Sequence, residues 1–184
     1  CVLGLAVALA ISAVPDTASA QVRMTVPPQS EPIALTGATI HPVTSGVIDN
    51  GTILFENGEI TAIGTDVQIP DNARVTDVTG KHVYPGLIDA YTTVGLSEIG
   101  AVDMSNDVRE VGDFNPNIRS EVAVNAESRH IGTSRSAGVL TALPTPAGGL
   151  ISGMSSALAL EGWTFEEMSL ESAAALNVNW PNPD

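Results

Sequence analysis

Short apolar runs alternate with turn-forming residues between positions 33 and 80, which is the pattern of a β-sheet. Asn57-Gly58 separates two such runs, and this dipeptide is typical of a type I′ hairpin turn because both central residues need positive φ. A second turn is predicted at Asp49-Asn50-Gly51. The pattern therefore predicts strands over residues 33–41, 47–48, 52–55, 59–63 and 74–78.

The pattern changes after residue 80 into a mixture of strand and helix. The run from Lys81 to Thr93 predicts a strand, and residues 95–117 show little periodicity, which indicates a long loop. Residues 119–137 are predicted to form a helix that Gly138 ends. Since residues 139–143 form a further short apolar strand, the order strand, loop, helix, strand predicts a βα unit.

Glycine and serine dominate residues 148–156, which predicts a flexible loop whose backbone amides can approach an anion. The loop lacks the lysine of a Walker sequence and the spacing of a dinucleotide fingerprint, so a plain connection or a close-packing turn is the favoured interpretation. Residues 157–160 are predicted to form another strand. Residues 164–167 have the spacing of a capping box, which predicts a helix that continues through Met168.

The first residues have the composition of an export signal. Residues 2–14 are almost wholly apolar, and small residues precede Gln21, as in the apolar region and cleavage site of a signal peptide. Pro15 and Asp16 interrupt the run before the roughly 18 residues of a membrane span. We therefore predict a signal peptide over 1–20 without its basic beginning, an extended leader over 21–32, and an exported, periplasmic or extracellular protein without stable membrane insertion.

The charge of the chain indicates which classes of molecule it can bind. The chain carries 21 acidic and 7 basic residues and a formal net charge of −14, which repels phosphate backbones. Nucleic acid is therefore not expected as a partner, and the acidic surface indicates a dispersed, soluble protein. Cys1 is predicted to leave with the signal peptide, so disulfides do not contribute to the mature chain.

The run Pro85-Gly86-Leu87-Ile88-Asp89 resembles the first barrel strand of the amidohydrolase superfamily, metal-dependent hydrolases with imidazolonepropionase-like and dipeptidase-like members. In that family the run is followed by His-x-His, and both imidazoles bind a catalytic divalent metal. Tyr91 and Thr93 hold those two positions here. The resemblance covers residues 33–93 well, and residues 136–141 resemble the segment at the second barrel strand.

The resemblance implies an α/β fold with a β-sandwich. Residues 33–80 are expected to form part of a small composite β-sandwich, and residues 81–184 the opening strands and helices of a (β/α)8 TIM-type barrel. A complete barrel needs about 250 residues, so the barrel is expected to be incomplete and the chain to be an N-terminal fragment. Because strand edges would then be uncovered, residues 21–184 alone are predicted to be poorly soluble.

Three side chains of the predicted strand are candidate site residues. The two-residue period of a strand places Tyr91 and Thr93 on one side, and Asp89 is predicted to share it. A phenol with a pKa of about 10 and a threonine hydroxyl are poor metal ligands. The two hydroxyls either contact substrate or fill the space of the missing imidazoles, and Asp89 either positions the site or braces the strand. No catalytic residue and no metal ligand is assigned.

Two main hypotheses about function follow from the resemblance. In the first, the protein hydrolyses a C–N bond of a small amide, cyclic imide or dipeptide-like substrate, with Zn, Fe or Mn held by ligands from later strands. In the second, it is a catalytically degenerate relative that acts as a binding or partner subunit, beside a second copy or an intact paralogue. A generic exported β-rich binding module is a third alternative.

The remaining polar groups are predicted to have structural roles. The three histidines lack supporting ligands at suitable spacing. Residues 113–117 resemble the opening of a calcium loop, but Ile118 and Val124 occupy positions that need Gly and Glu, so Asx turns are the favoured interpretation. The acidic residues of the predicted long loop indicate a solvated charged segment. These residues are His41, His82 and His130, and Glu98, Asp103, Asp107 and Glu110.

Overall fold

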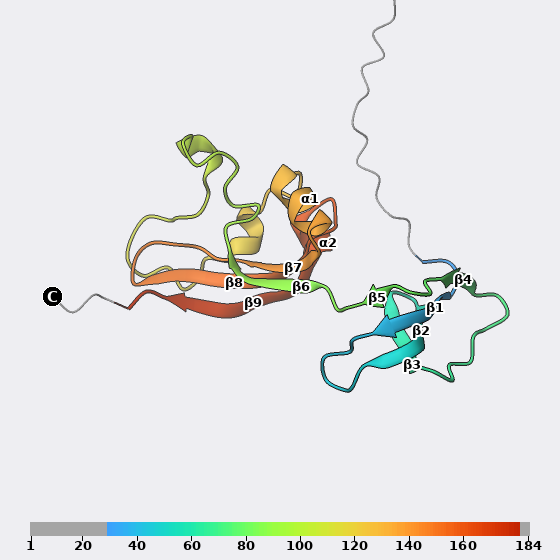
Figure 1. Ribbon diagram of the computed structural model, residues 1–184. Helices are drawn as coiled ribbons and strands as arrows, with labels where there is room; N and C mark the ends of the chain where they lie inside the picture. The colour runs from blue at the N-terminus through green and yellow to red at the C-terminus, as the bar shows by residue number, and fades with distance from the viewer. Residues whose placement is uncertain (1–28, 181–184) are drawn as a thin grey trace, which may run out of the picture.

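The computed structural model describes residues 29–180, and Figure 1 shows that they form two β-sheets joined by a short connection after residue 83. The predicted signal peptide and most of the leader lie outside the described residues. Between residues 29 and 180, no helix is long and apolar enough to cross a membrane. We call the sheet nearer the N-terminus sheet A and the other sheet B.

Sheet A has five strands in the order β3-β2-β1-β4, with β5 also paired to β1. Strands β1 and β2 and strands β2 and β3 are antiparallel, whereas β4 and β5 run parallel to β1. The predicted hairpin turn is confirmed, because Asn57 and Gly58 have φ values of 53° and 80°. The strands are β1 (Ile33–Ile40), β2 (Ile48–Glu56), β3 (Glu59–Gly64), β4 (Arg74–Asp77) and β5 (His82–Val83).

One predicted turn of sheet A is wrong. The sequence Asp49-Asn50-Gly51 lies inside β2, where the register against β1 shifts between the Ala38–Gly51 pair and the Ile40–Ile48 pair. Asn50 has a φ of 52°, and a Cβ on Gly51 would lie 2.5 Å from the Ile40 side chain. The turn residues therefore form a β-bulge that lets β2 lie close to β1, instead of ending the strand.

Sheet B has four strands in the order β6-β7-β8-β9. Strands β6 and β7 are parallel, and helix α1 (Arg129–Ser136) lies between them in the sequence, so the predicted order of strand, loop, helix and strand is present. Strands β8 and β9 return antiparallel. The strands are β6 (Leu87–Thr92), β7 (Val139–Pro144), β8 (Ile151–Ala159) and β9 (Ser169–Val178).

Two predicted elements of this half differ from the structure. Most of the predicted loop 148–156 belongs to β8. By contrast, the helix predicted to begin at the capping box and to continue through Met168 is confirmed as α2 (Phe165–Met168), after which β9 begins. Helix α1 is shorter than the predicted 119–137, because the Ser128 hydroxyl accepts the His130 backbone N–H and caps the helix there. Because β8 and β9 are antiparallel to their neighbours while β6 and β7 are parallel, sheet B is mixed. The part of the chain that the structure describes therefore shows no barrel of alternating strands and helices.

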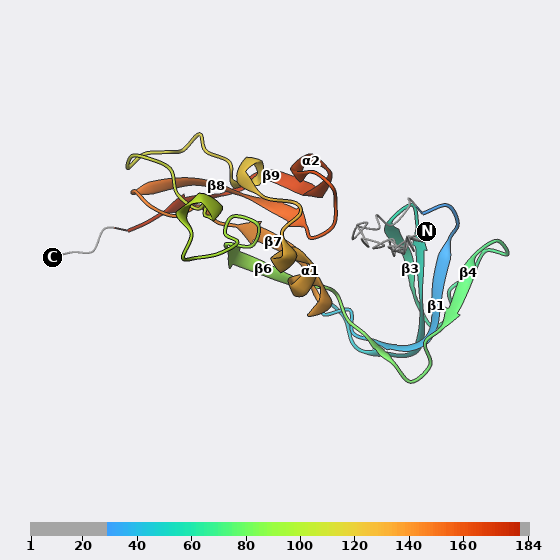
Figure 2. The ribbon, with the colours of Figure 1, turned by 90° about the horizontal axis from the view of Figure 1, so that it is seen from above.

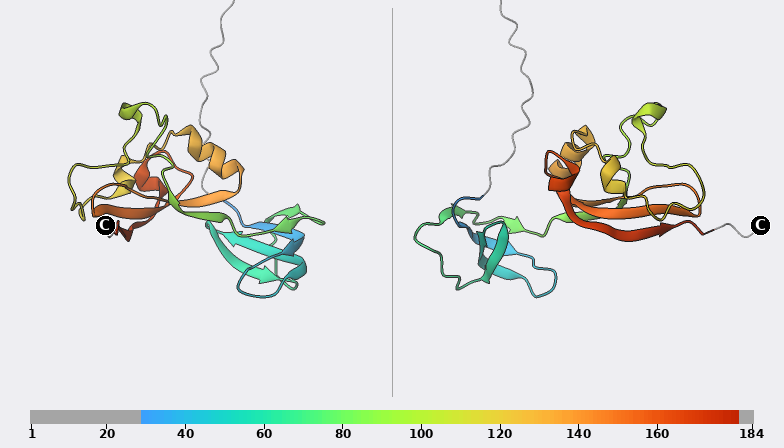
Figure 3. Two further views of the ribbon diagram at one scale, coloured as in Figure 1. Left: turned by 60° about the vertical axis from the view of Figure 1, so that its left-hand side comes forward. Right: turned by 180° about the vertical axis from the view of Figure 1, so that it is seen from behind.

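The helices and loops that pack on sheet B all lie on one of its two faces. Figures 1 and 3 show α1, α2 and the long segment after β6 on the same side of the sheet, while the other side is bare. Seen from above in Figure 2, both helices lie toward the end nearer sheet A. A hydrophobic core fills the covered side and consists of Leu96, Val124, Ala126, Ile131, Ala142, Leu158, Leu160 and Met168.

Candidate functional site at the end of strand β6

Strand β6 is an edge of sheet B, and its last residues lie beside the end of β7. The Thr145 backbone N–H donates to the Thr92 carbonyl oxygen at 2.8 Å. Asp89 pairs with Ala142 and Thr92 with Pro144, so three residues of β6 span the same length as two of β7. Because this irregularity interrupts the strand's alternation, a spacing of two residues does not by itself place Asp89 on the side of Tyr91.

The three predicted site residues occupy different surroundings. Tyr91 has 76% of its surface exposed, whereas Asp89 is half-buried. The Asp89 carboxylate accepts a hydrogen bond from the Tyr91 backbone N–H at 3.4 Å, which is a local turn contact. Thr93 is exposed just beyond the strand. A common site formed by these three side chains stays a prediction.

Thr93 borders a hollow of about 340 Å³ between the end of β6 and helix α1. Ser97 lines it from the following loop, and His130 and Thr133 line it from the helix. The His130 ring nitrogen Nε2 lies 3.0 Å from the Glu98 carbonyl oxygen, to which it donates when that nitrogen carries the proton. His130 lies on helix α1, as predicted, and this contact joins the helix to the loop after β6.

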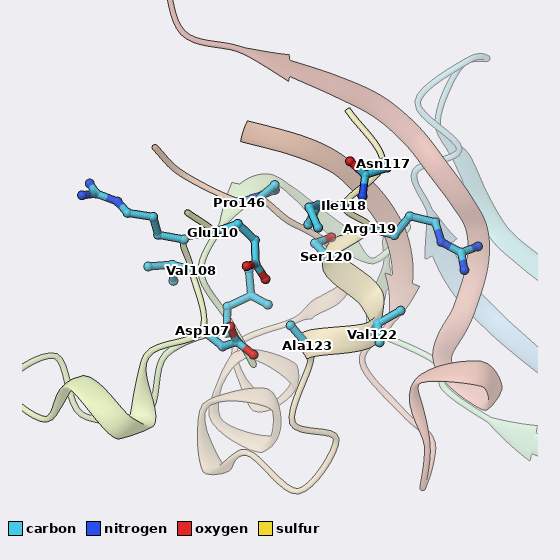
Figure 4. A pocket seen from close by; sticks show the side chains of 12 residues that line it. Asp107, Val108, Glu110, Asn117, Ile118, Arg119, Ser120, Val122, Ala123 and Pro146 are labelled. Carbon is cyan, nitrogen blue, oxygen red and sulfur yellow. The ribbon is translucent and has the colours of Figure 1, made fainter. Parts of the chain in front are cut away.

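Two acidic residues of the long loop line a second hollow, also of about 340 Å³. Figure 4 shows the Asp107 and Glu110 carboxylates directed into this hollow, while the Arg119 guanidinium points away from it. The Asp107 backbone N–H donates to the Leu96 carbonyl at 2.7 Å, and the Ala147 N–H donates to the Val108 carbonyl at 2.6 Å. The loop is therefore fixed to the segments that follow β6 and β7, near the two carboxylates.

The calcium-like segment 113–117 is held against the start of β8. The Asp113 carbonyl accepts the backbone N–H groups of Leu150 and Ile151 at 2.8 and 2.9 Å. Gly149 has a φ of 64°, and a Cβ there would lie 2.8 Å from the Gly112 carbonyl oxygen. The predicted close-packing turn is thus confirmed at this glycine, because no larger residue fits between the two segments.

A buried carboxylate that the sequence did not single out joins this loop to β9. Glu121 is only 4% exposed, and the hydroxyls of Ser172 and Ser169 donate to its oxygens at 2.6 and 3.3 Å. Burial raises the pKa of Glu121, but hydrogen bonds from Ser172, Ser156 and Ser169 and the Arg119 charge outweigh burial and hold this pKa below its usual value. Glu121 is therefore a charged structural link between the short 3₁₀ turn Ser120–Ala123 and the β8–β9 hairpin.

The serines that contact Glu121 come from two different strands. Ser156 lies on β8, and Ser169 and Ser172 lie on β9. Because the β8–β9 pairing was not predicted, nothing in the sequence showed that these hydroxyls meet.

In the part of the chain that the structure describes, metal-binding side chains do not gather near β6. Across residues 29–180, no group of three or more His, Cys, Asp and Glu side chains is placed to hold a metal ion. His41 and His82 do meet, with Nε2 and Nδ1 3.0 Å apart, but they lie in sheet A. The chemistry available at the end of β6 is thus that of hydroxyls, one imidazole and carboxylates.

Curated proteins resemble short parts of the chain, and no family model matches it. An imidazolonepropionase of a Geobacillus species is 33% identical over 76 residues, which are 34% of this chain and 18% of that protein. A dihydroorotase of Mycobacterium tuberculosis is 45% identical over 40 residues, 22% of this chain and 9% of that protein. The chain thus spans less than a fifth of the length of these relatives.

A solved structure extends the similarity to both sheets. An amidohydrolase from Thermotoga maritima matches with a TM-score of 0.74 and 26% sequence identity, over 82% of this chain and 39% of that one. Coverage this wide includes sheet A, the connection and sheet B together. The sequence matches and this shared arrangement agree with the resemblance of the Pro85–Asp89 run, and the chain belongs to the amidohydrolase superfamily.

Proposed function

We propose that this protein is an exported hydrolase that cleaves a C–N bond of a small amide, cyclic imide or dipeptide-like substrate by metal-assisted attack of water. The observation that carries the proposal is the match to the Thermotoga maritima amidohydrolase, which runs through both sheets. Matches to an imidazolonepropionase and a dihydroorotase support the same class. Export is proposed from the apolar segment and the small residues before Gln21.

The two first-strand positions do not fit a catalytic Zn, Fe or Mn ion. Tyr91 offers an exposed phenol, and Thr93 offers a hydroxyl that does not ionise near neutral pH. The proposal therefore requires metal ligands from later strands, and it assigns no step of the reaction to these two residues as ligands.

The proposed role of this region is to hold the substrate. In barrel enzymes the site forms at the C-terminal ends of the strands, which is where Thr93 follows β6. The hollow beside Thr93 presents a threonine hydroxyl, the Ser97 side chain and the His130 ring to a polar ligand. We propose that the Thr93 hydroxyl hydrogen-bonds a polar atom of the substrate.

A non-catalytic subunit is the second candidate, and a specific observation favours it. Tyr91 and Thr93 replace both imidazoles that the superfamily uses on the first strand, so the usual metal site lacks two of its ligands. Such a protein would bind a small molecule, a second copy or a catalytic paralogue without hydrolysing anything.

Metal analysis and turnover of the full-length protein decide between these candidates. Catalysis predicts Zn, Fe or Mn near one equivalent, together with hydrolysis of amide or cyclic imide substrates. Thr93→Val should then lower kcat/KM about fivefold, since one hydrogen bond contributes about 1 kcal/mol. Thr65→Val, at an exposed threonine just after β3, serves as the matched control. A metal-free protein that binds such compounds without turnover would overturn the first proposal and support the second.

A further inference from the structure

Two histidines 41 residues apart in sequence meet on one face of sheet A. Strands β1 and β5 run parallel, and Thr39 pairs with His82. His41 lies two residues beyond Thr39 and therefore on the same face as His82. The His41 backbone N–H donates to the Val83 carbonyl at 2.9 Å, so the backbone of the sheet fixes both histidines in register.

The two rings face each other through nitrogen atoms. His41 Nε2 and His82 Nδ1 are 3.0 Å apart, so one ring donates a hydrogen bond and the other accepts it. Tyr84 stacks on the His41 ring with a centroid distance of 4.3 Å and an interplanar angle of 6°, which restricts rotation of that ring. His41 is partly exposed and His82 is exposed, so a dissolved ion can reach both.

We propose that His41 and His82 form a binding site for a divalent transition-metal ion. Metal–nitrogen bonds of about 2.0–2.1 Å, with ligands about 90–110° apart, place two nitrogens about 2.9–3.4 Å from each other. The observed 3.0 Å lies within this interval. In two neutral rings, moving the shared proton to the outer nitrogen of the donor ring presents two lone pairs to the ion without net proton release.

The ligand chemistry selects the class of ion. Imidazole suits Zn²⁺, Ni²⁺ and Cu²⁺, whereas Mg²⁺ and Ca²⁺ prefer oxygen ligands. Water would complete the coordination of an ion held by two side chains. This site is separate from the proposed catalytic region, because both histidines belong to the β1–β5 edge of sheet A and not to the end of β6.

Titration of the full chain with Ni²⁺ and with Zn²⁺ tests the proposal. His41→Asn and His82→Asn each leave a single imidazole, and each should weaken metal binding at least about tenfold. His130→Asn is the matched control, since His130 lies on α1 and contacts the Glu98 carbonyl, and it should bind as tightly as the wild type. Equal affinity in all three variants, or a loss only in His130→Asn, would overturn the site.

A second measurement needs no variant and so does not depend on how a substitution folds. Acylation of imidazoles by diethyl pyrocarbonate, mapped by peptide mass, should slow several-fold at His41 and His82 when Zn²⁺ is present. The reaction at His130 should be unchanged, and Mg²⁺ should protect none of the three. If Zn²⁺ protects all three histidines equally or leaves His41 and His82 fully reactive, the pair is only a hydrogen bond between two rings.

Discussion

Sheets A and B differ in how far along the chain their partners lie. Strands β1, β2 and β3 follow one another through short connections, so pairing in this part of sheet A is largely local. Strands β6 and β7 are neighbours in sheet B although residues 93–138 separate them. Turn chemistry therefore determines much of sheet A, whereas sheet B depends on contacts between distant segments.

The two sheets also differ in how completely they are covered. Sheet A has a small core of Ala38, Ile40 and Ile53, which shares no residue with the larger core of sheet B. On the edge strand β6, Leu87 and Ile88 are 61% and 66% exposed. An edge strand with exposed apolar side chains is a surface that another strand can cover.

The separate cores predict that the sheets unfold in separate steps. Ile40→Ala should destabilise sheet A, and Leu158→Ala should destabilise sheet B, each by about 2–5 kcal/mol because the deletion leaves a cavity. Trp163 and Trp180 both lie in or beside sheet B, so tryptophan fluorescence during urea unfolding reports on that sheet. Hydrogen exchange of the β2 amides reports on sheet A.

The pattern of effects is the critical result. Leu158→Ala should shift the fluorescence transition to lower urea, and Ile40→Ala should leave it in place while it speeds exchange in β2. Equal shifts of the fluorescence transition in both variants would show that the two sheets unfold as one unit, and the contrast between them would be lost.

What the sequence predicted correctly is mostly local. Asn57-Gly58 specified its hairpin because few residues adopt positive φ at two successive positions. The same reasoning misread Asn50-Gly51, since a bulge uses the same residue types as a turn, and only the close approach of Ile40 distinguishes the two. The order of β6, α1 and β7 was also predictable, because an apolar strand pattern and a helix-ending glycine mark the ends of the unit.

The long-range features could not be predicted. Strand β8 is rich in Ser and Gly, a composition that resembles a loop. Only the pairing of β8 with β9 and the burial of its serines show that it is a strand. The Glu121 link depends on this pairing. The meeting of His41 and His82 similarly requires the parallel pairing of β1 with β5, and spacing in sequence gives no signal for it.

Glu121 gives sheet B a pH-dependent contribution to stability. Glu121→Gln removes the charge that Ser169 and Ser172 solvate and should lower the free energy of unfolding by about 1–3 kcal/mol at pH 7. Because the pKa of the folded carboxyl is below its usual value, this stability is present above the unfolded pKa of about 4.3 and is lost as pH falls through the folded pKa. The difference between wild type and variant should therefore shrink below about pH 4.

Fluorescence-detected unfolding at several pH values measures this difference. Glu166→Gln, at an exposed glutamate of α2, is the matched control and should change stability by less than about 0.5 kcal/mol. In sheet A, hydrogen bonds from the Thr79 side chain and backbone hold the pKa of Asp77 below its usual value. Asp77→Asn should therefore change hydrogen exchange of the β2 amides, which reports on sheet A, and leave the fluorescence transition of sheet B in place. A constant difference between wild type and Glu121→Gln from pH 7 to pH 3 would contradict a charged link.

The smallest expected effect concerns the turn that makes sheet A local. Gly58 has a φ of 80°, and a Cβ added there would meet no atom within 4 Å, so Gly58→Ala costs backbone strain alone, about 1 kcal/mol. Gly46 is equally open but has no positive φ, so Gly46→Ala should be neutral or slightly stabilising. Exchange of the β2 and β3 amides should accelerate about fivefold only in Gly58→Ala. If both variants behave alike, conformational preference at Asn57-Gly58 does not determine the register of β2 and β3, and sheet A relies on distant contacts as sheet B does.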